Sequence, residues 1–224
     1  MKATAIKIFL ILLSYGSLFS QTDNNLITKL FTKDKLVEMQ DKSNIEIWYY
    51  FPMKTKIDSG KCVGIDTMLN NYYSRQLRSI DEPVLYIRKL KKQIYRFTWL
   101  RNEENSIIIS IKKDRDDINL NYKMTDGQAG YKSGELILNK TKRLSIKEWK
   151  DFNSLIDKSN FWNTFPCDIN NGWTSSSDWI LEGSTNEHYH VIDFIGPSKK
   201  AFYEIFKFLF ELTELSEIPG LELQ

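Results

Sequence analysis

The feature that most constrains the fold is a series of short alternating segments between residues 84 and 138. Apolar side chains recur at every second position in three consecutive runs, which is the period of a β-strand with one buried face. Connections as short as residues 101–105 and 113–117 can join antiparallel strands, whereas parallel strands need a longer crossover. The pattern therefore predicts an antiparallel β-meander. The three rows are Tyr95, Phe97 and Trp99; Ile107, Ile109 and Ile111; and Ile118, Leu120, Tyr122 and Met124.

A second β region and a strongly apolar helix follow in residues 177–215. Residues 179–183 and 188–194 alternate and are rich in β-formers, and the segment between them has turn composition, so we expect a β-hairpin. A Gly-Pro-Ser break at residues 196–198 then starts a helix with an apolar stripe. Because the polar side of this helix mixes lysines and glutamates, core packing is favoured over a membrane-surface helix. The stripe contains Phe202, Ile205, Leu209 and Leu212.

Two further helices complete the predicted fold. Residues 67–80 have a moderate helical period, and Ser145 followed by Glu148 has the spacing of a capping box that starts a helix reaching about Ile156. The predicted fold class is α+β. We expect a single domain over residues 21–224, built as an antiparallel β-meander with a C-terminal β-hairpin and packed amphipathic helices.

Residues 1–20 have the pattern of a secretory signal peptide. Lys2 and Lys7 precede and enter an apolar run at residues 8–13, and small residues follow before the chain turns polar at Gln21. The run is too short to span a bilayer well. We therefore expect a secreted or periplasmic protein with no stable membrane span after the signal peptide is removed. The alternative is an uncleaved N-terminal anchor.

The charge distribution argues against a nucleic-acid partner. The chain carries 31 basic and 29 acidic residues, and two of the basic ones lie in the predicted leader, so the exported chain is formally neutral. The segment 88–101 is locally basic and rich in aromatic residues. We interpret it as a strand with one aromatic face and one solvated basic face, in preference to a surface for single-stranded nucleic acid.

The two cysteines, Cys62 and Cys167, allow one disulfide in an exported protein. The alternative is two unpaired, partly buried thiols. Neither cysteine has metal-ligand spacing to a histidine, and the sequence contains no C-x-x-C motif. The sequence predicts no cofactor.

Three residues of the predicted hairpin form a candidate catalytic group: Glu182, His190 and Asp193. The hypothesis depends on the hairpin register. A turn centred on residues 185–186 places Glu182 opposite Tyr189, whereas a slip of one residue places Glu182 opposite His190. The alternative is structural, because a glutamate and a histidine that face each other across two strands can also satisfy each other in a core.

His188 and His190 give a second, weaker hypothesis. They are two residues apart, so they point to the same face of one strand and could bind a metal ion or a small ligand, with Glu187 or Asp193 as a further ligand. Two histidines without a clear third ligand do not establish a metal site. The sequence contains no G-x-S-x-G, H-E-x-x-H or P-loop motif.

Aromatic residues suggest a binding surface. Trp173 and Trp179 could form, together with Trp162, a platform for a sugar or a peptide, although core packing of at least two of them is the favoured interpretation. The segment 126–134 has three glycines and predicts a wide turn between strands, with glycines at positive φ. Its Tyr131 could belong to a binding loop. The candidate binding residues are Tyr131, Trp173, Trp179 and Tyr189.

The C-terminal part of the chain carries several motifs in a fixed order. They are Asp126-Gly127-x-x-Gly130-Tyr131-x-x-Gly134, Leu144-Ser145-x-x-x-Trp149, Phe161-Trp162, Trp179-x-Leu181-Glu182-Gly183, Tyr189-His190 and Pro197. Over about residues 125–215 the chain resembles a family of uncharacterised secreted or periplasmic bacterial proteins, a domain of unknown function. The resemblance implies one folded unit and an exported location, and it implies no reaction. An Asp-Gly step expected shortly before the Trp-x-Leu-Glu-Gly motif is absent, because residues 175–178 read Ser-Ser-Ser-Asp.

These observations favour a non-catalytic binding or interaction domain of the cell envelope, whose partner is an unknown envelope component or another protein. One alternative is a hydrolase-like enzyme that uses Glu182 and His190 as an acid–base pair. The other is a small-ligand or metal-binding protein that uses the face shared by His188 and His190.

Overall fold

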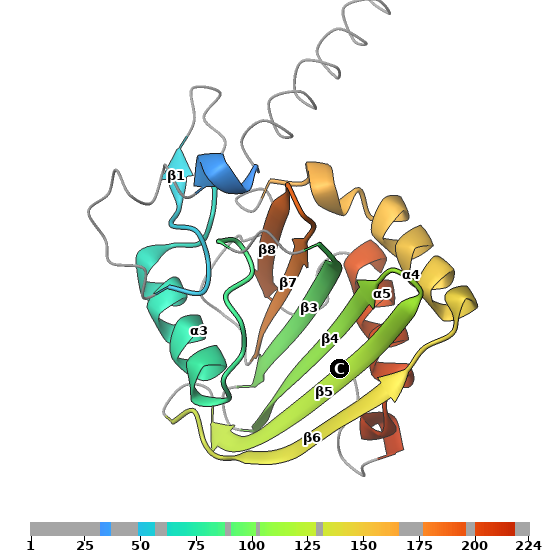
Figure 1. Cartoon of the computed structure of the whole chain (residues 1–224). Coiled ribbons are helices and arrows are strands. Elements are labelled where there is room, and N and C mark those ends of the chain that lie inside the picture. The colour runs from blue at the N-terminus through green and yellow to red at the C-terminus, as the bar shows by residue number, and fades with distance from the viewer. Residues whose placement is uncertain are drawn as a thin grey trace, which may run out of the picture.

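A six-stranded antiparallel sheet forms the centre of the protein (Figure 1). The structure is a computed structural model that describes residues 32–36, 49–56, 62–87, 91–101, 104–128, 132–165, 177–195 and 200–217. The strand order is β6-β5-β4-β3-β7-β8, which confirms the meander and places the C-terminal hairpin beside β3. The strands are β3 (Gln93–Arg101), β4 (Asn105–Asp114), β5 (Asp117–Gln128), β6 (Leu136–Arg143), β7 (Ser177–Ser184) and β8 (Tyr189–Ile195).

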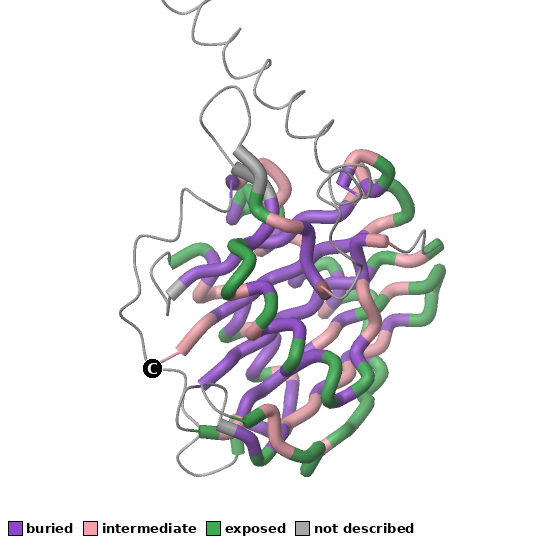
Figure 2. The backbone as a smooth tube through the Cα atoms, turned by 90° about the vertical axis from the view of Figure 1, so that its left-hand side faces the viewer, coloured by how far each residue is buried: buried purple, intermediate pink, exposed green. Residues whose placement is uncertain are grey.

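Helices lie on both faces of this sheet, and the α+β class is confirmed (Figure 1). One face is covered by α4 (Ile146–Lys158), α5 (Lys200–Glu211) and the short turns η1 (Phe161–Asn163) and η3 (Glu214–Glu217). The other face is partly covered by α3 (Thr67–Ser79) and by the segment 82–87. A small separate sheet pairs β1 (Thr55–Lys56) with β2 (Cys62–Val63). Figure 2 shows buried residues through the middle of the molecule and exposed residues on its outer surfaces.

The face under α4 and α5, called the sealed face below, is an aromatic and aliphatic core. The ring of Phe206 on α5 lies 3.8 Å from that of Phe97 and 4.6 Å from that of Trp179, measured between centroids. The predicted core-facing stripe is confirmed for Phe202, Ile205 and Leu209, which are buried, whereas Leu212 follows the end of α5 and is partly buried. The capping box of α4 is confirmed as well, with Ser145 accepting from the Glu148 N–H and Glu148 accepting from the Ser145 N–H.

The opposite face, called the mixed face below, changes character across the sheet. Beneath α3 and the segment 82–87 it is an apolar core. Toward β5 and β6 it carries polar side chains, because the alternate positions of these strands are Asn119, Asn121, Lys123 and Thr141. The apolar part contains Ile94, Leu100, Ile108, Ile180 and Val191 from the sheet, and Tyr73, Leu77, Leu85 and Tyr86 from the covering segments.

The described part of the β5–β6 connection fits the predicted wide turn. Gly134 has φ +74°, and a Cβ placed on Gly127 would lie 2.2 Å from the carbonyl carbon of Ser133, so both positions require glycine. The Asp126 carboxylate accepts from the Glu135 N–H at 2.7 Å and closes the turn.

Several sequence predictions fall outside the described residues. They concern the signal peptide at residues 1–20, the disulfide between Cys62 and Cys167, and the binding residues Tyr131 and Trp173. Among the helices that the structure describes, none combines the length and the hydropathy needed to cross a membrane.

Candidate functional site

The β7–β8 hairpin has neither of the two registers considered from the sequence. Ser184 pairs with Tyr189, so the turn has four residues, and Gly183 lies opposite His190. The turn is closed by hydrogen bonds between Thr185 and His188: the Thr185 N–H donates to the His188 carbonyl at 2.8 Å, and the His188 N–H donates to the Thr185 hydroxyl at 3.0 Å. Glu182 is therefore paired with Val191.

This register separates the predicted catalytic residues. Glu182 and Asp193 belong to the mixed face, whereas His190 belongs to the sealed face, because successive residues of a strand point to opposite sides. The acid–base group of Glu182, His190 and Asp193 is not formed. Glu182 and His190 are separated by the register, which is set by hydrogen bonds in the turn and cannot be read from strand alternation. His190 and Asp193 are three residues apart on β8, so alternation alone places them on opposite faces.

His190 is a core histidine. Its side chain is fully buried and its ring centroid lies 4.8 Å from that of Phe161. Burial lowers the pKa of His190 to about 3, although hydrogen bonds with the backbone of Thr164 and Phe161 act in the opposite direction. The imidazole is therefore neutral at physiological pH. Gly183 makes room for this arrangement, since a Cβ there would lie 2.6 Å from the Phe161 ring.

On the other side of the sheet, Glu182 is held by two fully buried partners. The Arg96 Nε–H donates to one carboxylate oxygen of Glu182 at 2.6 Å, and the Tyr189 hydroxyl donates to the other at 2.8 Å. All three side chains are inaccessible to solvent. Two charge-assisted hydrogen bonds of this kind offset the cost of burying the carboxylate.

The same guanidinium continues into a longer network, called the Arg96 network below, which comprises Glu82, Arg96, Lys123, Glu182 and Tyr189. Arg96 Nη1 donates to Glu82 at 3.1 Å, and the other oxygen of Glu82 lies 2.8 Å from Lys123 Nζ. Burial lowers the pKa of Arg96, but the nearby carboxylates of Glu182 and Glu82 have the larger effect, so the pKa of Arg96 is raised. Burial would also raise the pKa of Glu82, but Arg96 and Lys123 outweigh it and lower the pKa. Arg96 and Glu82 are therefore ionised. Burial raises the pKa of Glu182, although the hydrogen bonds from Arg96 and Tyr189 act against this shift.

Three members of the Arg96 network, Glu82, Arg96 and Lys123, line a pocket on the mixed face, called the sheet-face pocket below. Its volume is about 460 Å³. Ammonium, amide and hydroxyl groups of β4, β5 and β6 line it, and Glu82 is the one carboxylate among its lining residues. These residues are Glu82, Pro83, Leu85, Lys92, Ile94, Arg96, Ser110, Lys112, Asn119, Asn121, Lys123 and Thr141.

The sequence analysis missed this site. The basic face of segment 88–101 was expected to be solvated, but Arg96 is completely buried, and that interpretation was wrong for this residue. The signal was the row Ile94, Arg96, Thr98 and Leu100, in which one charge stands among uncharged residues on a strand whose other face carries Tyr95, Phe97 and Trp99. Such a charge needs buried partners, and the partners come from distant segments.

A buried Lys–Ser pair was also missed. Lys33 Nζ donates to Ser184 Oγ at 2.9 Å, and Ser184 Oγ donates in turn to the Leu85 carbonyl at 3.2 Å. Burial lowers the pKa of Lys33 to about 8. Because Ser184 is fully buried and its proton is directed at a carbonyl, the pair anchors the segment 32–36 to the hairpin and does not present a nucleophile.

The remaining predicted site residues that the structure describes are structural. Trp179 is 1% exposed and packs against Phe206, and Tyr189 is fully buried and bonded to Glu182. His188 lies in the turn and is partly exposed, while His190 is buried. Within the described ranges, no group of three or more His, Cys, Asp or Glu side chains could hold a metal ion.

No model of a known protein family matches the chain, and no curated protein matches it significantly. The geometry and the chemistry of the pockets are therefore the basis for a functional proposal.

Proposed function

We propose that this protein is an exported, non-catalytic binding domain of the cell envelope, and that the sheet-face pocket holds its ligand. The observation that carries the proposal is the donor-rich lining of a pocket of about 460 Å³, in which Arg96, Glu82 and Lys123 are held in place by their mutual contacts. Ligand sites typically combine such a cavity with a few fixed polar groups. The leader-like residues 1–20 and the resemblance described above support the exported location.

The geometry favours binding over hydrolysis. The hydrolase alternative needs Glu182 and His190 within hydrogen-bond reach of each other and of a substrate. Glu182 instead accepts hydrogen bonds from Arg96 and Tyr189, and His190 lies on the other face of the sheet. The metal-binding alternative needs the two histidines on one accessible face, and His190 is covered by Phe161.

The lining also indicates the kind of ligand. Lys92, Lys112 and Lys123 supply ammonium donors, and Asn119 and Asn121 supply amides. Cationic and neutral donors together suit a molecule that carries both a carboxylate and several hydroxyl groups. We propose an acidic sugar, either free or at the end of an envelope glycan.

Calorimetric titration tests this ligand class, with trigalacturonate as the acidic probe and a neutral galactose trisaccharide as its counterpart. We expect binding of the acidic probe alone, because its carboxylates can pair with the Lys112 ammonium, whereas the neutral sugar has no group to do so. Lys112→Ala should weaken binding at least fivefold. Lys207→Ala removes an equal charge from the exposed side of α5 and should leave binding within twofold. Equal affinity for both sugars, or an unaffected Lys112→Ala variant, would refute the proposal.

Export is tested separately. When the complete chain is expressed with its leader in a bacterium, the mature protein should begin close to Gln21 and be recovered outside the cytoplasm. N-terminal sequencing and cell fractionation measure both points. Recovery of an intact N-terminus in the cytoplasm would contradict the proposed location and leave the ligand test unaffected.

A further inference from the structure

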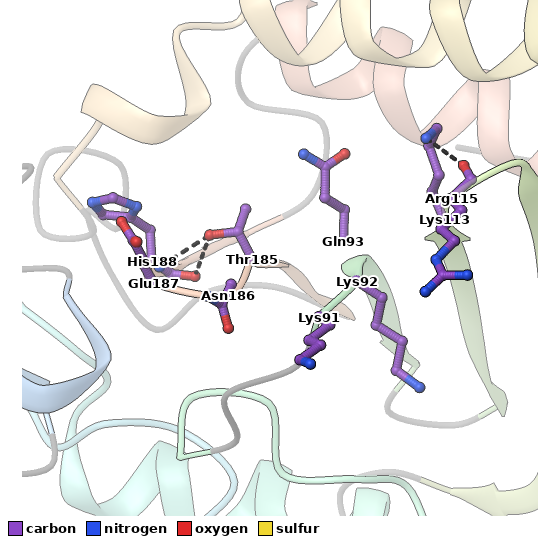
Figure 3. A pocket seen from close by; sticks show the side chains of 9 residues that line it. All are labelled: Lys91, Lys92, Gln93, Lys113, Arg115, Thr185, Asn186, Glu187 and His188. Carbon is purple, nitrogen blue, oxygen red and sulfur yellow. Dashed lines mark hydrogen bonds between the residues drawn. The ribbon is translucent and has the colours of Figure 1, made fainter.

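A second pocket lies at one end of the sheet, where three connecting segments meet (Figure 3). Its volume is about 620 Å³. The lining comes from the start of β3, from the β4–β5 turn and from the β7–β8 turn. We call it the loop-end pocket. It is lined by Lys91, Lys92, Gln93, Lys113, Arg115, Thr185, Asn186, Glu187 and His188.

The fold fixes the position of each contributing segment. Gln93 pairs with Lys113 across β3 and β4, and Ile94 pairs with Ser184 across β3 and β7, so the three segments are adjacent in the ladder. The β7–β8 turn is further held by residues 32–36, since the Lys33 N–H donates to the Glu187 carbonyl at 2.9 Å. Figure 3 shows the hydrogen bonds within the Thr185–His188 turn and the bond from Lys113 to the Arg115 carbonyl. The pocket walls are therefore built from strand ends that are tied to the sheet.

The charge of this pocket is strongly one-sided. Its lining has four basic side chains and one carboxylate, Glu187. In the described ranges, no carboxylate lies within ion-pair distance of Lys91, Lys113 or Arg115. Cations brought together without acidic partners repel each other, and an anionic ligand relieves that repulsion. The whole chain has 31 basic and 29 acidic residues, so this concentration of cations is a local property and not an effect of net charge.

We propose that the loop-end pocket is a second binding site, which takes a ligand with two neighbouring phosphate groups. A single small anion would contact only part of a pocket of this size, whereas a diphosphate can reach cations on more than one segment. The Arg115 guanidinium suits bidentate contact with phosphate oxygens, and lysine ammonium groups act as point charges beside it. Gln93, Thr185 and Asn186 add neutral donors at the rim.

This inference does not rest on the acidic-sugar proposal, although Lys92 lines both pockets. The test therefore leaves Lys92 unchanged. It uses the double variant Lys113→Gln/Arg115→Gln, whose residues line the loop-end pocket only. The matched control is Lys132→Gln/Lys207→Gln, which removes the same charge from two exposed positions, one in the β5–β6 connection at the opposite end of the sheet and one on α5.

Calorimetric titration with pyrophosphate and with inorganic phosphate measures the site. The wild type should bind pyrophosphate at least tenfold more tightly than phosphate, with an affinity that falls as salt rises, because the contacts are electrostatic. The Lys113→Gln/Arg115→Gln variant should lose at least tenfold in pyrophosphate affinity, while the control pair and Lys112→Ala stay within twofold. Absence of pyrophosphate binding by the wild type, or equal losses in the two double variants, would overturn the proposal.

Diphosphate chemistry can come from a soluble compound or from a lipid headgroup, and vesicles separate the two sources. The arms are vesicles of phosphatidylcholine alone and vesicles that also contain a lipid with a diphosphate headgroup. Cosedimentation with the second kind, abolished in Lys113→Gln/Arg115→Gln, supports the site and assigns a membrane source. Pyrophosphate binding without cosedimentation supports the site and assigns a soluble source. Cosedimentation that the double variant retains would overturn a lipid-binding role for this pocket.

Discussion

The two faces of the central sheet are built from the same strands but stabilised in different ways. The sealed face is closed by α4 and α5 through contacts between aromatic and aliphatic side chains. The mixed face has a smaller apolar core beneath α3, and beside it the Arg96 network and a polar pocket. Burial of apolar area favours any well-packed arrangement, whereas a buried ion network is favourable only when every partner is in place.

The difference explains where a binding site can exist. Helices α4 and α5 cover the sealed face. In the described residues, the polar side chains that its strands expose on this face therefore lie at strand ends and on β6. On the mixed face, the ion network holds Lys123 and Glu82 in fixed positions at the boundary between the core and the open part of the sheet. A ligand that meets such preorganised groups loses less conformational entropy on binding. The sheet-face pocket therefore lies on the face with the smaller apolar core.

The largest expected effect tests the ion network. Arg96→Met removes the guanidinium and leaves Glu182 buried without its cation, so the free energy of unfolding should fall by about 3–5 kcal/mol. Urea denaturation followed by tryptophan fluorescence measures this loss. Arg96 is fully buried, and its contact with Glu182 is 2.6 Å.

The companion variant is Arg96→Met/Glu182→Gln. It removes both charges and keeps an acceptor for the Tyr189 hydroxyl, so it should be more stable than Arg96→Met alone. If the double variant is no more stable than the single one, the mixed face is held by packing, and its contrast with the sealed face disappears.

The two faces also differ in how much of their structure the sequence predicts. Alternation in rows such as Ile107, Ile109 and Ile111 predicts strands, and short connections predict their antiparallel order, because both are local constraints. The α5 stripe and the Ser145 capping box are local as well. These elements account for nearly all of the sealed face.

The candidate site depends on distant contacts, and the sequence did not predict it. Arg96 is 86 residues from Glu182 in the chain, and the strand pattern of Arg96 is the same whether its side chain meets water or a carboxylate. The hairpin register depended on hydrogen bonds within the turn, so the Glu182–His190 hypothesis could not be decided in advance. The Trp-x-Leu-Glu-Gly and Tyr-His motifs are explained by packing: Trp179 and Gly183 serve the sealed face, and Glu182 binds Tyr189.

The next largest effect concerns pH, and its sign differs between the two faces. His190 on the sealed face has a pKa lowered to about 3 by burial, so only the unfolded state gains a proton as the pH falls below about 6.5. Its contribution to stability is complete above pH 6.5 and is lost on acidification. When the pH is lowered from 7 to 5, the free energy of unfolding of the wild type should fall by about 2 kcal/mol relative to that of the His190→Gln variant.

Asp178 on the mixed face acts in the opposite direction. Burial raises its pKa to about 6, although a hydrogen bond from Tyr73 acts against the shift. The folded state therefore holds a proton at pH values where the unfolded carboxyl has lost it, and stability falls as the pH rises from about 4 to 6. When the pH is lowered from 7 to 5, the free energy of unfolding of the wild type should rise by about 1 kcal/mol relative to that of the Asp178→Asn variant. Urea denaturation at the two pH values measures both differences, and equal signs for the two variants would contradict the assignment of these residues to their environments.

The smallest effect compares the packing of the two faces directly. Ile108 and Ile109 are neighbours on β4, point to opposite faces and are both buried. Ile109→Val removes one methyl group from the sealed face and should cost about 0.5–1.5 kcal/mol, and Ile108→Val removes the same group from the apolar part of the mixed face. We expect a similar loss for both, because Ile108 is 1% exposed and Ile109 is 0% exposed. Ile137→Val on the exposed strand β6, where Ile137 is 49% exposed, is the control and should change stability by less than about 0.5 kcal/mol. If Ile108→Val costs no more stability than the control while Ile109→Val does, the mixed face is loosely packed beneath α3 as well as at the sheet-face pocket.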